Sequence, residues 1–437
     1  MPCLEAIFAH ITFDSCNFGE LAVRQRRSWR QIESIEFWDG PRRETRAKLK
    51  VIKERKMKKI IAAAAGLAMV AGTASSVLAL ENEFGGYWRT RMFTQIDFQE
   101  DGSYSIVDTR TRLYYTAKFN EGFKFVNKFE MDAVWGGPGT SYGDVGADGK
   151  SFEIKNSYAD VDAFGANFKI GVQGVRVARG LLIDTDASAF IATFKAGDIV
   201  LPFAWMRVTE DEVPGQEERD HYAVLPVIQA GEGLTIQPMF IYDKQQSSDW
   251  NNYYVGANVD MKTDAFSAWG TGVYQFGEVM DQDLSAFLLA AGASAGPVHG
   301  QVFYATGDDD ATDGDIDAFV NPAGASYYWA EILGAGTFDP GRANGPYDRI
   351  SNAWAANVGV KVKPSDKLTV GADVWYAALA EDDAAGETDL GIEFDVKATY
   401  AIYENLALDL VAAYLIAGDA YGEDDPIEVG ARVSLAF

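Results

Sequence analysis

The segment 390–400 alternates apolar and polar side chains without a break. Its apolar residues are Ile392, Phe394, Val396, Ala398 and Tyr400, and the residues between them are Glu393, Asp395, Lys397 and Thr399. Because a β-strand points successive side chains to opposite faces, one face of this segment is apolar and the other is charged. Ionised groups without partners are costly to bury in an apolar core. The segment therefore needs hydrocarbon on one side and water on the other.

The same alternation recurs towards both ends of the chain, in segments 112–119, 123–132, 406–414 and 427–437. One such strand also fits a soluble sandwich, whereas the repeated two-residue period is the signature of a transmembrane β-barrel with an apolar outer face and a polar lumen. Backbone groups in lipid must all be paired, which permits only helices or a closed barrel. One face of these segments is too charged for a membrane helix. We therefore predict an all-β, antiparallel, up-and-down transmembrane barrel.

The turns and loops support this prediction independently. The candidate strands are 84–98, 104–119, 123–135, 151–164, 166–177, 188–197, 198–210, 220–230, 233–244, 251–262, 265–277, 283–295, 297–307, 350–363, 367–379, 389–402, 404–418 and 426–437. Tight turns alternate with longer stretches at 136–150, 178–187, 211–219, 245–250, 308–349, 380–388 and 419–425. Barrels of this kind have short periplasmic turns and long extracellular loops. The prediction is eighteen strands, with sixteen as the alternative. Both termini of the barrel domain are then on the periplasmic side.

The N-terminal residues are expected to be separate from the barrel. Residues 57–79 have a positive start, an apolar run and a small residue at the end, which is the pattern of a secretory signal peptide. An uncleaved anchor is the alternative, although the run is shorter than the ~20 apolar residues of a membrane helix. Residues 1–56 contain both cysteines, and we interpret them as an upstream extension outside the fold, with a genuine cytoplasmic extension as the alternative. The barrel domain is then 80–437.

The chain is acidic, with 64 Asp and Glu against 38 Lys and Arg and a formal net charge of −26. This balance argues against nucleic acid as a partner, because phosphate backbones are bound by basic patches.

Charged residues fall on the predicted water-facing sides of the strands. The basic ones are Arg89, Arg91, Arg110, Arg112, Lys124, Lys128 and Arg432, and acidic ones on the same inner faces are Asp373, Glu393 and Asp395. The last strand of a closed barrel pairs with the first, so Arg432 is expected beside Arg89 and Arg91. Rings of charged side chains select ions in pores, and we interpret these residues as pore-lining residues that form a selectivity wall. The alternative is that neighbouring acids neutralise the arginines, which then only stiffen the wall.

The stretch 308–349 is far longer than an ordinary connection, and loops of such length are usually functional or disordered. Its aromatic residues Tyr327, Tyr328 and Trp329 would expose large apolar surfaces if the loop extended freely into water. We expect part of this loop to fold back on the barrel and to form the constriction, with a cap or a partner-binding surface as the alternative.

Aspartates crowd the start of the same loop. A calcium loop that begins at Asp309 would need oxygen ligands at Ala311 and Val320, where this chain has none. A calcium site at Asp309, Asp313 and Asp315 is therefore a weaker interpretation than a solvated acidic loop, and no other metal is predicted.

No motif predicts catalysis or a cofactor. Gly149-Lys150-Ser151 lacks the earlier glycine of a phosphate-binding loop and lies between a loop and a strand. His221 and His299 lie in predicted strands without an evident serine and acid beside them, so they do not form the constellation of a barrel hydrolase.

The chain resembles a Gram-negative outer-membrane porin over the whole of 80–437. The last strand ends on Phe437 after alternating apolar residues, which resembles the signal that barrel-assembly machinery reads in that family. The segments 84–91 and 108–112 resemble alginate-export-type porins of eighteen strands more loosely. The resemblance implies a multi-pass barrel in the cell outer membrane that is not an enzyme.

We therefore predict a water-filled channel for passive diffusion of small hydrophilic solutes and ions, with a modest anion preference. The expected partners are outer-membrane lipid, lipopolysaccharide, the permeating solutes and the barrel-assembly machinery, and the expected oligomer, if one forms, is a homotrimer. A structural or interaction barrel, such as an adhesin or a sheath for an electron-transfer partner, is the main alternative. An outer-membrane hydrolase is the other.

Overall fold

The computed structural model describes residues 80–98, 102–137, 152–210, 217–245, 250–310, 312–338 and 346–437. The predicted extension 1–56 and signal peptide 57–79 lie outside the described residues. The strands are β1 (Glu81–Ile96), β2 (Tyr104–Asn120), β3 (Phe123–Val134), β4 (Phe152–Ala163), β5 (Ala166–Val177), β6 (Ile183–Ala196), β7 (Ile199–Thr209), β8 (Arg219–Val224), β9 (Val227–Gly231), β10 (Leu234–Gln245), β11 (Trp250–Lys262), β12 (Ser267–Val279), β13 (Gln282–Ala295), β14 (Val298–Ala305), β15 (Asp315–Ile316), β16 (Ala353–Ser365), β17 (Leu368–Leu379), β18 (Asp389–Tyr403), β19 (Leu406–Ala417) and β20 (Ile427–Ala436).

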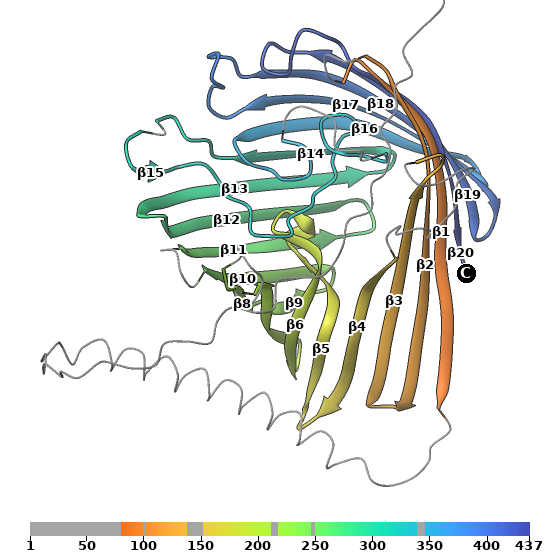
Figure 1. Cartoon of the computed structure of the whole chain (residues 1–437), viewed down its shortest axis with the longest axis vertical. Coiled ribbons are helices and arrows are strands. Elements are labelled where there is room, and N and C mark those ends of the chain that lie inside the picture. The colour runs from red at the N-terminus through yellow and green to blue at the C-terminus, as the bar shows by residue number, and fades with distance from the viewer. Residues whose placement is uncertain are drawn as a thin grey trace, which may run out of the picture. The chain divides into compact units, whose positions relative to one another are not determined.

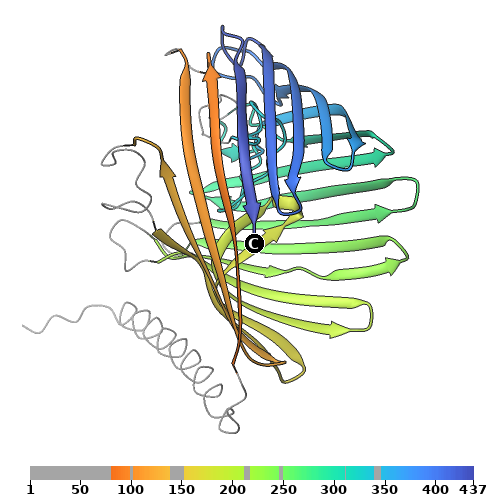
Figure 2. The ribbon, with the colours of Figure 1, turned by 90° about the vertical axis from the view of Figure 1, so that its right-hand side faces the viewer.

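The strands form one closed antiparallel barrel, because β1 pairs with β2 on one side and with β20 on the other. Figures 1 and 2 show the strands following one another around the wall in chain order. The twenty segments do not correspond to twenty barrel strands. β8 and β9 count as one strand, which is interrupted at Leu225 and Pro226. β15 is not a barrel strand, because it is a two-residue piece of a loop that lies parallel to β13. The barrel therefore has eighteen strands, and the alternative of sixteen is wrong.

The two faces of the wall are those that the alternation predicts. On β18, Phe394 and Val396 are 42% and 49% exposed, whereas Glu393 and Asp395 between them are 0% and 8% exposed. Apolar side chains are exposed around the barrel in the same manner, for example Val255, Leu289 and Val358. A soluble protein would bury these side chains, so the outer face of the barrel is suited to hydrocarbon.

A row of aromatic rings crosses the outside of the barrel near one end. Tyr222 and Tyr242 have ring centroids 6.1 Å apart, Tyr242 and Tyr253 stack at 4.7 Å, and Tyr253 and Phe276 stack at 5.2 Å. These residues lie on β8, β10, β11 and β12, at the ends of the strands that the longer loops join. Aromatic girdles mark the levels at which barrels of this kind meet the membrane interface.

One connection at this end differs from the prediction of long loops. β12 and β13 are joined by a two-residue turn, in which Met280 and Asp281 have φ angles of 53° and 66°. Two successive positive φ angles are the geometry of a type I′ hairpin turn, whose twist matches that of the flanking strands.

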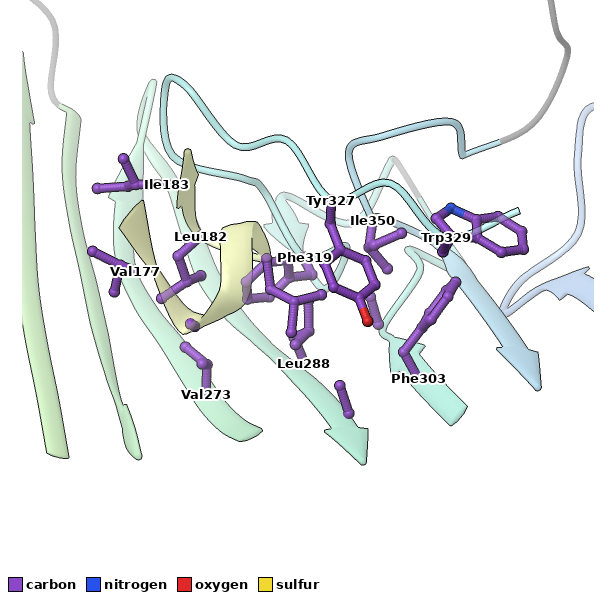
Figure 3. Packing of buried hydrophobic residues seen from close by; sticks show 14 of the residues in the cluster. Val177, Leu182, Ile183, Val273, Leu288, Phe303, Phe319, Tyr327, Trp329 and Ile350 are labelled. Atoms are coloured by element: carbon purple, nitrogen blue, oxygen red, sulfur yellow. The ribbon is translucent and has the colours of Figure 1, made fainter. Parts of the chain in front are cut away.

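The apolar core lies inside the barrel. Residues of the loop between β14 and β16 and of the turn after β5 enter the lumen and pack on inward-facing side chains of the wall. Figure 3 shows Leu182 of the turn and Phe319 and Tyr327 of the loop beside Val273 and Leu288 of the wall. Within the described ranges, no helix is long and apolar enough to cross a membrane.

Candidate functional site

The long loop is fixed in the lumen by its aromatic residues. The Trp329 ring meets the rings of Phe303 on β14 and Trp375 on β17 edge-on, at centroid distances of 5.1 and 5.0 Å, and its Nε1 donates a hydrogen bond to the Tyr347 carbonyl oxygen at 2.7 Å. Edge-to-face ring pairs of this kind add about 0.5–1.5 kcal/mol each beyond their buried area. The structure thus places residues 319–338 of the predicted constriction loop inside the barrel, whereas residues 312–315 are exposed.

The tyrosines before Trp329 point in different directions. Tyr327 is 8% exposed, and its hydroxyl donates a 2.7 Å hydrogen bond to Gln301 Oε1 on β14. Burial raises the pKa of Tyr327 to about 12, so the hydroxyl keeps its proton over the ordinary pH range. Tyr328 is 52% exposed and lines the open part of the lumen.

Polar bonds to the backbone fix the first half of the loop. The Val320 amide donates a 2.9 Å hydrogen bond to Gln275 Oε1, and its carbonyl oxygen accepts hydrogen bonds from Gln275 Nε2 at 2.9 Å and from the Tyr254 hydroxyl at 2.7 Å. Gln275 and Tyr254 are fully buried. Because a buried polar group that loses its partner is destabilising, these bonds specify one position of the loop.

A second, shorter segment also enters the lumen, and the sequence did not predict it. Leu181 and Leu182 after β5 are 1% and 0% exposed. The Gly180 carbonyl oxygen accepts a hydrogen bond from the Ser326 amide at 3.1 Å, which ties the turn to the long loop. Gly180 has a φ of 99°, and a Cβ there would collide with the Ser326 carbonyl oxygen, so only glycine fits. The apolar run Leu181-Leu182-Ile183 inside an expected loop was the available signal.

The predicted basic side chains lie inside the barrel, and most of them are paired. Arg91 binds Asp108 at 2.6 Å, and Arg432 binds Asp409 at 2.7 Å. Arg91 and Arg432 are direct partners in the register between β1 and β20, as expected from closure, and Arg89 lies opposite Arg110 on β2.

The pairing continues on β2 and β3. Arg110 binds Asp132 at 2.6 Å, and Arg112 binds Glu130. The side chains of Arg110, Arg112 and Asp132 keep 25%, 24% and 41% of their surface exposed. The interpretation that neighbouring acids neutralise the arginines therefore describes the local geometry, and the exposed fractions leave these charges within reach of ions in the lumen.

The lysines of the predicted wall are held less closely. Lys124 lies 3.3 Å from Asp160, and the ammonium of Lys128 lies 5.1 Å from the centre of the Tyr114 ring. Lys155, which the sequence analysis did not single out, binds Asp186 at 2.6 Å. These groups extend the charged surface from β2 to β4.

A cavity of about 650 Å³ lies in the lumen beside the long loop. Lys361 on β16, Gly371 on β17 and Lys397 on β18 are direct register partners and form one row of its wall. Gly371 leaves open space between the two lysines. Two residues after Gly371 on β17, Asp373 accepts a hydrogen bond from Asn357 Nδ2 at 2.7 Å and contacts His299 Nε2 at 2.8 Å.

The two histidines lie in separate places. His221 on β8 is 2% exposed and lies 3.3 Å from Asp243, which Arg219 also binds. His299 on β14 belongs to the cavity described above. Among the described residues, the polar neighbours of His221 and His299 are the carboxylates Asp243 and Asp373, and no nucleophile is bonded to either ring.

Glu393 and Asp395 lie beneath the long loop. The structure buries both carboxyl groups between β18 and residues 331–333, so that Glu393 is shut off from the cavity, whereas Asp395 lines it while only 8% exposed. Asp373, the third acid of the predicted set, also lines the cavity.

Phe437 closes the seam of the barrel. Its carbonyl oxygen accepts a 2.7 Å hydrogen bond from the Gly86 amide, and its own amide donates to the Gly86 carbonyl oxygen at 3.1 Å. A Cβ on Gly86 would collide with the Phe437 ring. The role of Phe437 as an assembly signal stays a prediction.

No cluster of metal-ligating side chains was found in the described part of the chain. Asp310, beside the weak calcium candidates Asp309, Asp313 and Asp315, accepts hydrogen bonds from the amide and the hydroxyl of Thr312, which lower the pKa of its carboxyl.

Solved structures match this chain, whereas no protein-family model and no curated protein sequence does. OpdQ of Pseudomonas aeruginosa has a TM-score of 0.55 and 13% identity, over 81% of this chain and 99% of that chain. OccAB4 of Acinetobacter baumannii has a TM-score of 0.56 and 12% identity, over 82% and 98%. The outer membrane protein OprD from Pseudomonas aeruginosa has a TM-score of 0.52 and 13% identity, over 82% and 93%.

This chain has the fold of the Occ and OprD outer-membrane proteins. The predicted barrel of eighteen strands is therefore confirmed. The matches support a porin fold in general, and they do not support the narrower resemblance to alginate-export-type porins.

Proposed function

We propose that this barrel is an outer-membrane channel through which small hydrophilic solutes and ions diffuse passively. The observation that carries the proposal is the division of the wall, with apolar side chains outside and ion-paired, partly exposed charges inside. A wall of this kind places the barrel in lipid and leaves a polar path along β2, β3 and β4. The likeness in fold to OprD and Occ proteins supports the proposal.

The same barrel has a modest anion preference in this proposal. The exposed charges on β2 and β3 include Arg110 and Arg112, and the row of Lys361 and Lys397 faces the cavity without a carboxylate directly opposite in the register. Acids on the same wall keep the preference small. The proposed surroundings are outer-membrane lipid and lipopolysaccharide, with insertion by the barrel-assembly machinery and a homotrimer as the oligomer.

Liposome swelling tests the proposal. Vesicles that contain the folded 80–437 chain should swell in solutions of small hydrophilic solutes, at rates that fall as solute size increases. Vesicles with heat-unfolded protein are the control. Swelling no faster than that of the control for every solute would show that the barrel does not conduct.

A further inference from the structure

One part of the long loop is bound to the wall in a way that differs from the rest. We define the strap as residues 331–338, which pass over β18, β20 and β1. Its main-chain N–H groups face an acid of the wall, and its main-chain carbonyl groups face a base.

The acid is Glu393 in the middle of β18. Its two carboxylate oxygens accept hydrogen bonds from the Ile332 amide at 2.6 Å and the Leu333 amide at 2.9 Å. Glu393 is 0% exposed, so no solute in the lumen reaches it. Loss of these hydrogen bonds is costly, because the buried amide groups would stay without an acceptor.

The bases are Arg91 on β1 and Lys397 on β18. Arg91 Nη1 donates to the carbonyl oxygens of Thr337 at 3.2 Å and Phe338 at 3.0 Å, while its Nε and Nη2 bind Asp108. Lys397 Nζ donates to Thr337 Oγ1 at 2.9 Å. The strap is therefore clamped at both ends by charged side chains of opposite sign.

Other acids surround the clamp. The Glu331 amide of the strap donates a 3.4 Å hydrogen bond to Asp395 Oδ2 on β18, and Gln95 Nε2 donates a 2.6 Å hydrogen bond to Glu428 Oε2 on β20. Asp395 Oδ1 and Glu428 Oε1 are buried without a hydrogen-bond partner within the described structure. Buried polar atoms without partners are destabilising, so the hydrogen bonds of the clamp hold the strap over a part of the wall that is not fully satisfied.

We propose that this clamp makes Glu393 and Arg91 the positioning residues of the channel: they hold the strap against the wall and so set the width of the passage, and loss of the clamp releases the strap into a wider, fluctuating channel. The remainder of the loop stays in place, because Phe319, Tyr327 and Trp329 anchor it in the apolar core. The effect on conduction rests on the proposed channel function, whereas the effect on the strap does not.

The first test measures single-channel conductance in planar bilayers. Glu393→Ala removes both acceptors and should raise the conductance by about two-fold with a noisier open level, and Glu393→Gln, which keeps one oxygen acceptor, should fall between it and the parent. Asp243→Ala is the matched control, because Asp243 is also a fully buried carboxylate but binds Arg219 and Trp250 of the wall rather than the loop. Unchanged conductance and noise in an intact Glu393→Ala barrel would overturn the proposal.

The second test does not depend on conduction. Both cysteines of the chain lie before residue 57, so the 80–437 protein with Ala335→Cys has a single thiol in the strap. Ala335 is 1% exposed, and a maleimide should label Cys there slowly in the parent and at least about ten-fold faster beside Glu393→Ala. Equal labelling rates refute the clamp. Faster labelling in a barrel that carries no current would keep the clamp and refute the channel instead.

Discussion

The Arg110 guanidinium donates two hydrogen bonds, at 2.7 and 2.6 Å, to the Asp132 carboxylate on the neighbouring strand. Bidentate pairs of this kind hold both side chains in one geometry. The pair keeps its positive and negative ends at fixed places in the lumen wall, where each can attract ions of opposite sign.

Replacing both Arg110 and Arg112 by Ala should shift the reversal potential in a salt gradient towards cation selectivity. The reason is that Asp132 loses Arg110 as its basic partner, and Glu130 keeps only the more distant Lys155, at 3.9 Å. The converse pair, Asp132→Asn with Glu130→Gln, should shift the potential towards anions. If both double variants keep the parent reversal potential, these residues have no part in selectivity.

A charged residue should destabilise the barrel more on its outer face than in its lumen. Val396 lies in the middle of β18 and points outward, and an arginine at such a place in the bilayer costs about 2–4 kcal/mol. Thr369→Arg is the control, because Thr369 on β17 faces the lumen cavity and its register partner Thr399 lies three residues from Val396. The measurement is the urea midpoint of folding into vesicles. Equal losses of stability for Val396→Arg and Thr369→Arg would mean that the faces are assigned wrongly.

Phe437 should matter for assembly in cells more than for stability. Its main-chain bonds to Gly86 do not depend on the side chain, which is 58% exposed. Phe437→Ala should therefore refold in vitro like the parent but give several-fold less folded barrel in a Gram-negative host, and Phe437→Tyr should restore the yield. Heat-modifiable migration on gels measures both. Normal assembly of Phe437→Ala in the host would exclude the predicted role.

The docking of Tyr327 should weaken in strong alkali. Below pH 10 the phenol is protonated in both the docked and the unfolded loop, and its bond to Gln301 is fully present. As the pH rises from 10.0 to about 12, the unfolded loop loses the proton more readily than the docked one, so docking loses stability over this interval. The difference in tyrosinate absorbance between the parent and Tyr327→Phe should show a step near pH 12. A step near pH 10.0, the ordinary pKa of tyrosine, would indicate that Tyr327 is not docked.

The strand pattern could be predicted because lipid and water impose a two-residue period that sequence alone displays. Residues such as Phe394 and Glu393 fall on opposite faces whatever their partners are. The start of β6 was missed, because Ile183 to Ala187 resemble a loop and become a strand only by pairing with β5. The short turn at Met280 and Asp281 was also missed, because neither residue is the glycine or asparagine that usually marks such a turn.

The candidate site was less predictable, because it depends on contacts between distant segments. The aromatic residues at 327–329 indicated that the loop returns to the barrel, and they do lie in the lumen. Nothing local indicates that Glu393 faces the Ile332 amide, since the two are joined only when the loop enters the barrel. The pairing of Arg110 with Asp132 likewise requires the register between β2 and β3, which the sequence of either strand alone does not specify.

The most direct test of the whole account is the ion current through the folded 80–437 chain in a planar lipid bilayer, with folding checked first by heat-modifiable migration. The account predicts stepwise increases of current as single barrels insert. Membranes that take up the folded protein and show no steps of current would contradict it.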